Sequence, residues 1–392
     1  MTSDQYRRAL LLELLHAGLE RVDGRRCVRA ALLARPLAPP GAPVWAAAIG
    51  KAAGAMALGA IDALGSSLER VLVITKSGHL VPELLALPGV ETHESAHPVP
   101  DERSLAAGQR LLEWVGELPA TVSPLFLISG GASSLVEVPE AGVSLADLEQ
   151  LSVRALADGV PIAELNARRA RLSRIKGGRL AALLAGRTAR ALFISDVPND
   201  DPAVIGSGLL GPAASGGDGI ERQIIASVDQ AMEGVAAAAA QRGLTVERAP
   251  ERFADEATRL ATRFAHQLLI GNTQVRIWGG ESTVHLPLNP GRGGRNQHLA
   301  LAAAKLLQDY PELLLLAVGT DGTDGPTEVA GALVDAETCA RVALAGLDPD
   351  DCLERADSAT ALAAADALVR TGPTGTNVAD LVIGLKLPPA RA

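Results

Sequence analysis

Short segments that read as strands alternate along this chain with amphipathic segments, and this alternation restricts the fold more than any other feature. The first half of the chain contains five such strand segments, namely 44–50, 71–75, 89–94, 124–129 and 191–195. Helical patterns at 51–64 and 102–118 lie between them. Strands joined by helices are typical of a parallel sheet that has helices on both faces. The sequence therefore predicts an α/β fold.

A second, smaller α/β domain is expected in the last third of the chain. Strand patterns recur there at 274–280, 282–288, 313–320, 329–335 and 380–387. Helical patterns cover 252–270 and 294–308, and two more helices are expected before the last strand. A length of 392 residues fits two or three domains. We place the boundary at residue 255, so the predicted domains are 1–255 and 256–392.

Three further segments carry helical patterns: residues 1–35, residues 144–185 with a break at 159–161, and the alanine-rich segment 220–242. A loop rich in Gly, Pro and Asp, 196–219, separates the last two. Loops longer than about 15 residues in compact domains are usually functional or disordered. This loop is therefore a candidate functional segment.

Composition argues against several classes of partner. The net charge of -9 has the wrong sign for a nucleic-acid binder or for binding to acidic membranes, and only 2% of residues are aromatic. No uncharged apolar run of about 20 residues occurs, so we expect no membrane span. Three cysteines without C-x-x-C spacing argue against a disulfide framework and a structural zinc site, and a cytoplasmic location is expected. Those cysteines are Cys27, Cys339 and Cys352.

Two motifs match known signatures but lack the required context. The HESAH segment, 93–97, has the H-E-x-x-H pattern of zinc proteases, which requires a helix. Here Pro98 follows directly, and a proline disfavours helical conformation at the residue before it. The GSGLLG segment, 206–211, matches the dinucleotide pattern G-x-G-x-x-G but lies in mid-loop and ends at Pro212. Neither match predicts a site.

Glycine-rich turns at the ends of predicted strands are the stronger signal, because ligands of open α/β sheets bind at the carboxyl ends of the strands. Lys51 follows a strand and Gly50 and begins a helix. A helix N-terminus favours anions, and an ammonium group beside it adds a charge for phosphate. The alternative is a surface lysine, which would be unfavourable in a first helical turn.

The segment SGGASS, 129–134, is a second such turn. Its glycines let backbone N–H groups face a ligand, and its serines add hydroxyl groups. It is either a cradle for a carboxylate or phosphate, or a tight turn with serine capping. The candidate binding residues are Ser129, Gly130, Gly131, Ser133 and Ser134.

Two further glycine turns carry basic residues in an otherwise acidic protein. Lys176 precedes Gly177–Gly178, a pair of glycines that would cost about 1 kcal/mol each in a helix. Arg295 follows a glycine pair and begins a predicted helix, and its guanidinium suits carboxylate or phosphate. Lys176 and Asn296 are therefore added to the candidate binding residues.

Two acidic loops are candidate magnesium sites. Asp196 begins an Asp- and Asn-rich run after a buried strand, and Asp324 lies in a D-G-T-D-G loop after another. Carboxylates suit Mg²⁺, although such runs also form plain turns. Calcium is not expected, because the second loop lacks the 12-residue EF-hand pattern.

Taken in order, these segments resemble the MOFRL-type glycerate 2-kinases. The resemblance runs from about residue 5 to 387 and rests on IGKAA, HPVPD, SGGASSL, LSRIKGGRLA, SDVPNDDPAVIGSG, GGEST, GRGGRNQ, GTDGTDGPTEVAGA and GPTGTNVADL. It implies a Rossmann-like N-terminal domain, a smaller α/β MOFRL domain and an active site in the cleft between them. One departure is Asn199, where the family pattern leads us to expect Gly.

The resemblance also implies an activity. Such an enzyme transfers the γ-phosphoryl group of ATP to the C2 hydroxyl of D-glycerate, giving 2-phosphoglycerate and ADP, with Mg²⁺ as cofactor. Lys51 and Arg295 fall on the family's important lysine and arginine and are the expected catalytic residues. The expected partners are glycerate and nucleotide, and homo-oligomer formation is left open. Two alternatives are an NAD(P)H-dependent hydroxypyruvate reductase, a label some family members carry, and a non-catalytic protein that binds small anions.

Overall fold

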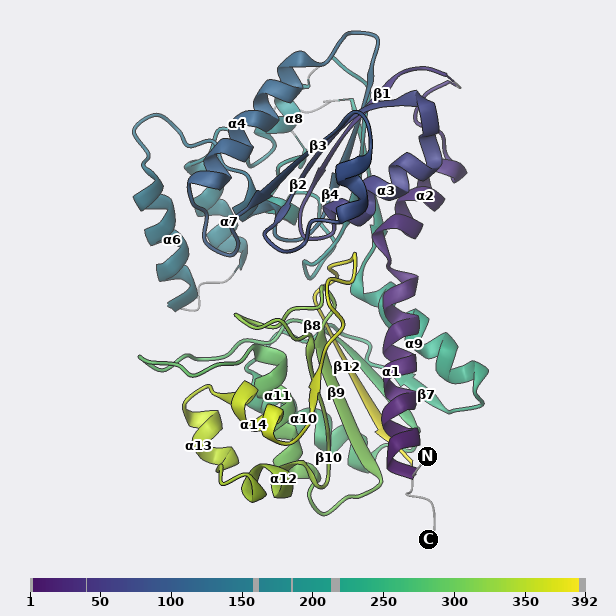
Figure 1. Ribbon diagram of the computed structural model, residues 1–392, viewed down its shortest axis with the longest axis vertical. Coiled ribbons are helices and arrows are strands. Elements are labelled where there is room, and N and C mark those ends of the chain that lie inside the picture. Colours follow the sequence, from purple (N-terminus) through teal and green to yellow (C-terminus); the bar gives the residue numbers. More distant parts are fainter. Residues whose placement is uncertain (1–2, 40, 158–161, 185, 213–218, 388–392) are drawn as a thin grey trace. The chain divides into compact units, whose positions relative to one another are not determined.

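The structure is a computed structural model that describes residues 3–39, 41–157, 162–184, 186–212 and 219–387. The chain forms two compact units (Figure 1). The parallel-sheet unit comprises Val22–Ser227 and Gly375–Val378. The mixed-sheet unit comprises Met1–Arg21, Val228–Thr374 and Ala379–Ala392.

The first unit is built on six parallel strands in the order β3-β2-β1-β4-β5-β6. They are β1 (Val44–Ile49), β2 (Leu68–Lys76), β3 (Val90–Ser95), β4 (Ser123–Ile128), β5 (Ala189–Ile194) and β6 (Ile220–Ala226). This is the strand order of the dinucleotide-binding Rossmann fold, so the predicted Rossmann-like sheet is confirmed. Ile49 pairs with Ile74 and Ile128, which brings the ends of the three central strands to one level.

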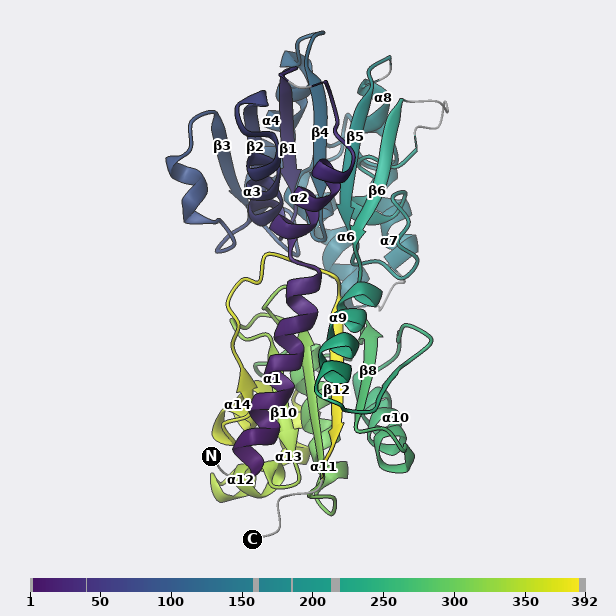
Figure 2. The ribbon, with the colours of Figure 1, turned by 90° about the vertical axis from the view of Figure 1, so that its right-hand side faces the viewer.

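Helices cover both faces of this sheet, as Figure 2 shows for α2 and α3 on one face and α4 and α8 on the other. The helices are α2 (Gly24–Ala34), α3 (Ala53–Leu64), α4 (Glu102–Glu117), α5 (Ala132–Leu135), α6 (Leu145–Ala157), α7 (Ile162–Arg171) and α8 (Arg179–Leu183). Short 3-10 turns are Gly65–Ser67, Pro82–Ala86 and Ile205–Ser207. Trp114 of α4 anchors one core, with its ring 6.1 Å from Trp45 and 5.8 Å from Phe126.

The second unit has a mixed sheet in the order β11-β10-β9-β12-β8-β7. Its strands are β7 (Val246–Arg248), β8 (Val275–Gly280), β9 (Leu313–Gly319), β10 (Gly331–Asp335), β11 (Leu368–Val369) and β12 (Asp380–Lys386). All neighbours are antiparallel except β7 and β8. The α/β class predicted for this part of the chain is therefore confirmed, with a sheet that is mostly antiparallel.

Two helix layers bury this second sheet. One layer is α1 (Ser3–Arg21) and α9 (Val228–Gln241); the other is α10 (Ala257–Ile270), α11 (Arg295–Leu307), α12 (Thr338–Leu344), α13 (Pro349–Glu354) and α14 (Ser358–Ala364). Alternate residues of β9 face opposite layers, because side chains of a strand point alternately to its two faces. Leu314 and Leu316 pack with α1 and α9, whereas Leu313 and Leu315 pack with α10 and α11.

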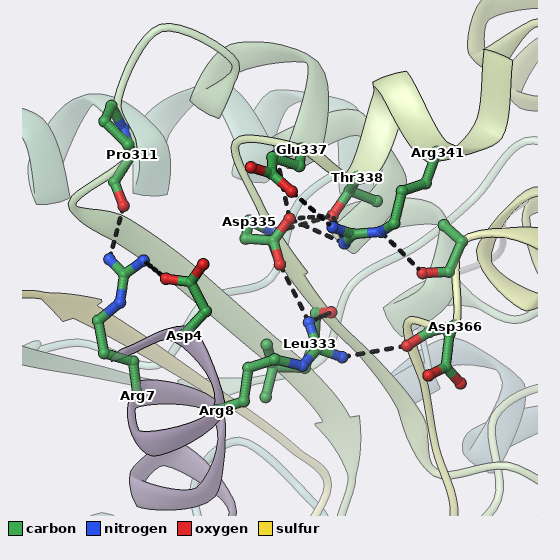
Figure 3. A network of polar contacts seen from close by, with 11 residues as sticks. Asp4, Arg7, Arg8, Pro311, Leu333, Asp335, Glu337, Thr338, Arg341 and Asp366 are labelled. Carbon is green, nitrogen blue, oxygen red and sulfur yellow. Dashed lines mark hydrogen bonds and ion pairs between the residues drawn. The ribbon is translucent and has the colours of Figure 1, made fainter. Parts of the chain in front are cut away.

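Helix α1 belongs to the mixed-sheet unit although it lies at the start of the chain. Arg7 donates to the carbonyl oxygen of Pro311 at 2.5 Å, and Arg8 pairs with Asp335 at 3.1 Å (Figure 3). The compact units therefore differ from the predicted division at residue 255, since α1 and α9 both cover the second sheet. The apolar pattern of a helix shows that one face is buried, but not which sheet buries it.

Three predicted helical segments differ from the structure. Residues 220–226 form strand β6, at the edge of the first sheet, and only 228–241 are helical. The segment predicted as one helix over 1–35 contains two, Ser3–Arg21 and Gly24–Ala34, because Asp23 caps a new helix by accepting from the N–H of Arg26. Within 144–185, residues 172–178 are not helical, and the break predicted at 159–161 lies outside the described residues.

The segment 282–288, predicted as a strand, is also different. It is largely irregular, and Thr283 makes only an isolated bridge with Glu256. Pro287 and Pro290 remove backbone donors from this region, which limits ladder pairing. Within the described residues, no helix is long and apolar enough to cross a membrane.

Candidate active site

The predicted glycine turns of the parallel-sheet unit lie at one edge of its sheet. Lys51 follows β1, His97 follows β3, Gly130 follows β4 and Asp196 follows β5. Since all six strands are parallel, these residues leave the sheet at its carboxyl edge, where α/β proteins bind ligands. The structure thus brings together turns that are up to about 150 residues apart in the sequence.

The turns after β1 and β4 are joined by hydrogen bonds. The N–H of Lys51 donates to the carbonyl oxygen of Gly130 at 3.0 Å, and the N–H of Ala52 donates to Ser129 Oγ at 3.1 Å. Gly50 has a φ of +131°, and a Cβ there would lie 2.1 Å from Ser129 Oγ. Ser129 is buried and therefore fixes the start of α3 and the backbone of Lys51.

Side chains surround the two glycines after Ser129. A Cβ on Gly130 would lie 2.0 Å from both Asn377 Nδ2 and Asp196 Oδ2, and Asn377 donates to that oxygen at 3.3 Å. A Cβ on Gly131, whose φ is +84°, would lie 3.1 Å from His97 and 3.2 Å from Lys51 Cγ. Only glycine fits these close approaches. Within the described residues, no hydrogen bond occupies the N–H groups of Gly130 and Gly131.

The hydroxyl groups of the two serines that follow, Ser133 and Ser134, donate hydrogen bonds to other groups of the protein. Ser134 Oγ donates to the carbonyl oxygen of Pro98 at 2.7 Å. Ser207 donates its hydroxyl proton to Asn166 Oδ1 at 2.8 Å. In the 2.6 Å contact between Ser133 and Ser207, Ser133 is therefore the donor. Both hydroxyls therefore stabilise the loop, and the backbone of the glycine turn is the better anion donor.

Lys176 lies in a buried ion pair. Its ammonium group contacts the carboxylate of Glu137, and the two side chains are 2% and 1% exposed. Burial lowers the pKa of Lys176, while the charge of Glu137 acts in the opposite direction. The structure therefore places this predicted binding residue in the packing beneath the loops, with Glu137 as a partner that the sequence did not reveal.

In the mixed-sheet unit, Arg295 begins α11 between two carboxylates. Its Nε lies 2.7 Å from Asp380 Oδ2, its Nη2 donates to Asp380 Oδ1 at 3.0 Å, and its Nη1 contacts Glu281. Asp380 is the first residue of β12 and pairs there with Gly280 and Gly319. We call Arg295, Glu281 and Asp380 the Arg295 cluster.

Charges in the Arg295 cluster shift the pKa values of Arg295 and Asp380. Burial raises the pKa of Asp380 to about 6; Arg295 opposes this shift, and Glu281 adds to it. Burial acts to lower the pKa of Arg295, but Asp380 and Glu281 outweigh it and raise that pKa. The guanidinium therefore stays charged, and the carboxylate of Asp380 takes up a proton more readily than an ordinary aspartate does.

Asp324 fixes the start of the same helix. Its Oδ1 accepts from the backbone N–H and Nδ2 of Asn296 at 3.1 and 3.3 Å, and its Oδ2 accepts from the N–H and Nε2 of Gln297 at 2.8 and 2.9 Å. A Cβ on Gly294 would lie 2.2 Å from Asp324 Cγ. Asp324, expected as a metal ligand, is therefore a buried helix cap with both oxygens engaged, and Asn296 supports that cap.

Four residues of these sites were not predicted as site residues from the sequence: His97, Asn377, Glu281 and Asp380. Each lies in or beside a motif that was noted, HPVPD, TNVAD or GGEST. Glu281 directly follows a predicted strand and Asp380 begins one, which is a signal that could have singled them out. Asn377 carried no such signal, because the loop that brings it to Gly130 comes from the far end of the chain.

Neither of the two rejected motifs has the helical context that its signature requires. Strand β3 ends at Ser95, so His97 lies in a loop and not on a helix. No group of three or more His, Cys, Asp or Glu that could hold a metal ion occurs among the described residues. The segment 206–211 contains part of a 3-10 turn and opens no helix.

Two family descriptions match the chain. Residues 10–239 match a domain of unknown function, DUF4147, and residues 274–380 match the MOFRL family. The Rossmann-like sheet and the mixed sheet thus define a class of protein that combines these two α/β parts.

Similar proteins with names indicate which activities occur in this class. The D-glycerate 2-kinase of Thermotoga maritima is 35% identical over 415 residues, covering 96% of this chain and 97% of that protein. The crystal structure of a glycerate kinase from the same organism matches with a TM-score of 0.84 and 34% identity, covering 98% of this chain and 100% of that one. A protein of Agrobacterium vitis with the provisional name hydroxypyruvate reductase is 37% identical, covering 85% of this chain and 96% of its own. The chain belongs to the MOFRL family of glycerate 2-kinases, as its motifs led us to expect.

Proposed function

We propose that this protein is an ATP-dependent glycerate 2-kinase, which phosphorylates the C2 hydroxyl of D-glycerate. The observation that carries the proposal is the turn of Gly130 and Gly131, packed against Lys51 at the carboxyl edge of a Rossmann-like sheet. Backbone N–H groups and an ammonium group at such an edge suit phosphate oxygens. The relatives named glycerate kinase support this assignment.

Two cations are assigned to the proposed reaction. In phosphoryl transfer, catalysis consists almost entirely of positioning and of neutralising charge on the transferring group. We assign Lys51 and Arg295 to that neutralisation and the backbone of Gly130 and Gly131 to anion binding. Ser129 positions Lys51 by fixing the first turn of α3. An active site formed between the two units remains a prediction.

Magnesium, when bound with the nucleotide, would neutralise negative charge on the phosphate groups. Mg²⁺ sites in such enzymes often use only one or two protein carboxylates beside the phosphates. Asp196 fits this role because it lies beside the glycine turn and is only partly buried. Asp324 fits poorly, since a metal ion would have to displace four hydrogen bonds that cap α11. We therefore propose Asp196 as the protein ligand.

An ADP-release assay over a panel of hydroxy acids tests the proposal. Phosphorus NMR of the product separates 2-phosphoglycerate from 3-phosphoglycerate. Replacing Lys51 by Ala should lower kcat by at least a hundredfold, as does loss of one charge-stabilising donor in other enzymes. Lys305, which pairs with Asp350 on the surface, provides a matched control, and Lys305→Ala should change kcat less than twofold. Full activity of a folded Lys51→Ala protein would refute the assignment.

The reductase alternative is favoured by the names of two relatives but by no feature of the sheet edge. A nicotinamide site needs a glycine fingerprint between the first strand and its helix. Here the segment between β1 and α3 reads GKA, whereas the G-x-G-x-x-G match at 206–211 lies in a late loop. Consumption of NADH or NADPH with hydroxypyruvate, without coupling enzymes, would support the reductase. Binding of glycerate or nucleotide without ADP formation would support a non-catalytic protein.

A further inference from the structure

The two carboxylates of the Arg295 cluster are held in different ways. Asp380 is 1% exposed and is fixed in β12 by ladder pairing to strands on both sides. Glu281 is 49% exposed, directly follows β8 and contacts only one nitrogen of the guanidinium. One carboxylate is therefore built into the sheet, and the other lies on the surface.

With both carboxylates paired to Arg295, the Arg295 cluster is not arranged to bind an anionic ligand. One guanidinium between two carboxylates carries a formal charge of about -1 when all three are ionised. A phosphate or carboxylate of a ligand would meet Glu281 on the accessible side of Arg295. To bind such a group, Arg295 has to lose one of its two partners.

Glu281 can leave far more easily than Asp380. Exposed ion pairs are worth only about 0–1 kcal/mol, because water solvates the separated charges. A buried carboxylate that loses its partner keeps its desolvation penalty, so Asp380 has to stay paired. Arginine has five N–H donors in a planar fork; Asp380 uses the side with Nε and Nη2, and the nitrogen that contacts Glu281 can serve an incoming oxygen.

We infer that Asp380 is the positioning residue of Arg295, and that Glu281 is an exchangeable partner which the oxyanion of the ligand displaces. The inference rests on the proposed function for the identity of that ligand. It gives the two carboxylates opposite effects: Glu281 competes with the ligand, whereas Asp380 holds the guanidinium ready for it.

Binding measurements with the full-length protein test the competition. The probes are D-glycerate, ATP and inorganic phosphate, each titrated alone by calorimetry. Replacing Glu281 by Gln should tighten binding of at least one probe about twofold to fivefold, since a surface ion pair is all that the ligand no longer has to break. The probe that responds identifies which oxyanion Arg295 binds. Unchanged or weaker binding of all three would overturn the inference.

Kinetics of Asp380 variants test the positioning role. Asp380→Asn should lower kcat at least tenfold, whereas Glu281→Gln should lower KM and change kcat less than twofold. Asp380→Glu, which keeps the charge, should recover part of the lost kcat. Asp335→Asn is the matched control, because Asp335 pairs with two arginines of the same unit. If Asp380→Asn and Asp335→Asn had equal kcat, the positioning role would be refuted.

Two features keep these tests decisive. Glu281→Gln is a surface substitution of equal size, so it should fold even if an Asp380 variant does not. The calorimetric test does not require turnover, so it separates the inference from the proposed function. Tighter binding in Glu281→Gln, in a protein that does not phosphorylate glycerate, would refute the kinase and support the exchange.

Discussion

Two arginine–carboxylate clusters of the mixed-sheet unit have opposite arrangements. In the Arg295 cluster, one guanidinium lies between two carboxylates. In the other, which we call the Asp335 cluster, the carboxylate of Asp335 lies between Arg8 at 3.1 Å and Arg341 at 2.8 Å (Figure 3). Thr338 donates to the same carboxylate at 2.9 Å. One cluster thus has an excess of acceptors and the other an excess of donors.

The difference appears in the pKa values of the two aspartates. Burial acts to raise both. For Asp335, the charge of Arg341, the hydroxyl of Thr338 and the charge of Arg8 outweigh burial and lower the pKa. For Asp380, burial and Glu281 outweigh the charge of Arg295, and the pKa rises to about 6. The comparison indicates that the Asp335 cluster fixes α1 to its sheet, whereas the Arg295 cluster is set up for exchange.

Replacing an arginine of each cluster by alanine should give the largest difference in kcat between the two clusters. Arg295→Ala should lower kcat at least a hundredfold, because a charge that stabilises the transferring group is lost. Arg8→Ala should leave kcat within twofold and lower the melting temperature by a few degrees, since it only removes contacts of α1. ADP release and thermal unfolding of both variants measure this. Equal kcat values for the two variants would show that the clusters do not differ in function.

Removing the aspartate charge from each cluster should lower the free energy of unfolding by different amounts. At pH 7, Asp335→Asn should destabilise the protein by about 1–3 kcal/mol, because two partly buried arginines lose their shared partner. Asp380→Asn should cost less, since Arg295 keeps Glu281 and a buried charge with a raised pKa is removed. Urea unfolding at pH 7 compares the free energies. A larger loss for Asp380→Asn would reverse our interpretation of the two clusters.

Sequence patterns predicted those parts of the fold that depend on local chemistry. The strands β1, β4 and β5 are apolar runs because both faces of the sheet are buried, and such runs are visible in the sequence. Strand β6 was missed because IERQIIA has neither a full apolar run nor a clear alternation, as its place at the sheet edge allows.

Parts of the site that depend on tertiary packing could not be predicted. Lys51 and Arg295 stood out because each follows glycine at the start of a predicted helix. Nothing local distinguishes Asp324, a helix cap used from 28 residues away, from an open metal ligand. The burial of Lys176 against Glu137 likewise depends on contacts between segments that are 39 residues apart.

The smallest expected effect concerns the pH dependence of activity, and it tests how the Arg295 cluster responds to charge. Asp380 loses its charge as the pH falls through about 6, so it then releases its hold on Arg295, and kcat should fall on that acid side. The groups that set this pKa, besides burial, are Arg295, Glu281 and the amide of Asn296. Since Glu281 raises the pKa, Glu281→Gln should move the midpoint of the acid limb to lower pH by a fraction of a unit.

The control for this shift is again Asp335→Asn, which should leave the midpoint unchanged because Asp335 belongs to the other cluster. The stability of the protein should respond with a matching sign. A carboxylate whose pKa is raised on folding binds its proton more tightly in the folded state, so its contribution to stability falls as the pH rises from about 4 to about 6. Asp335, whose pKa is lowered, contributes stability that is lost as the pH falls below 4. Rate–pH profiles and urea unfolding at several pH values measure both effects, and an acid limb that moves to higher pH in Glu281→Gln would contradict the charge balance on which the comparison of the clusters depends.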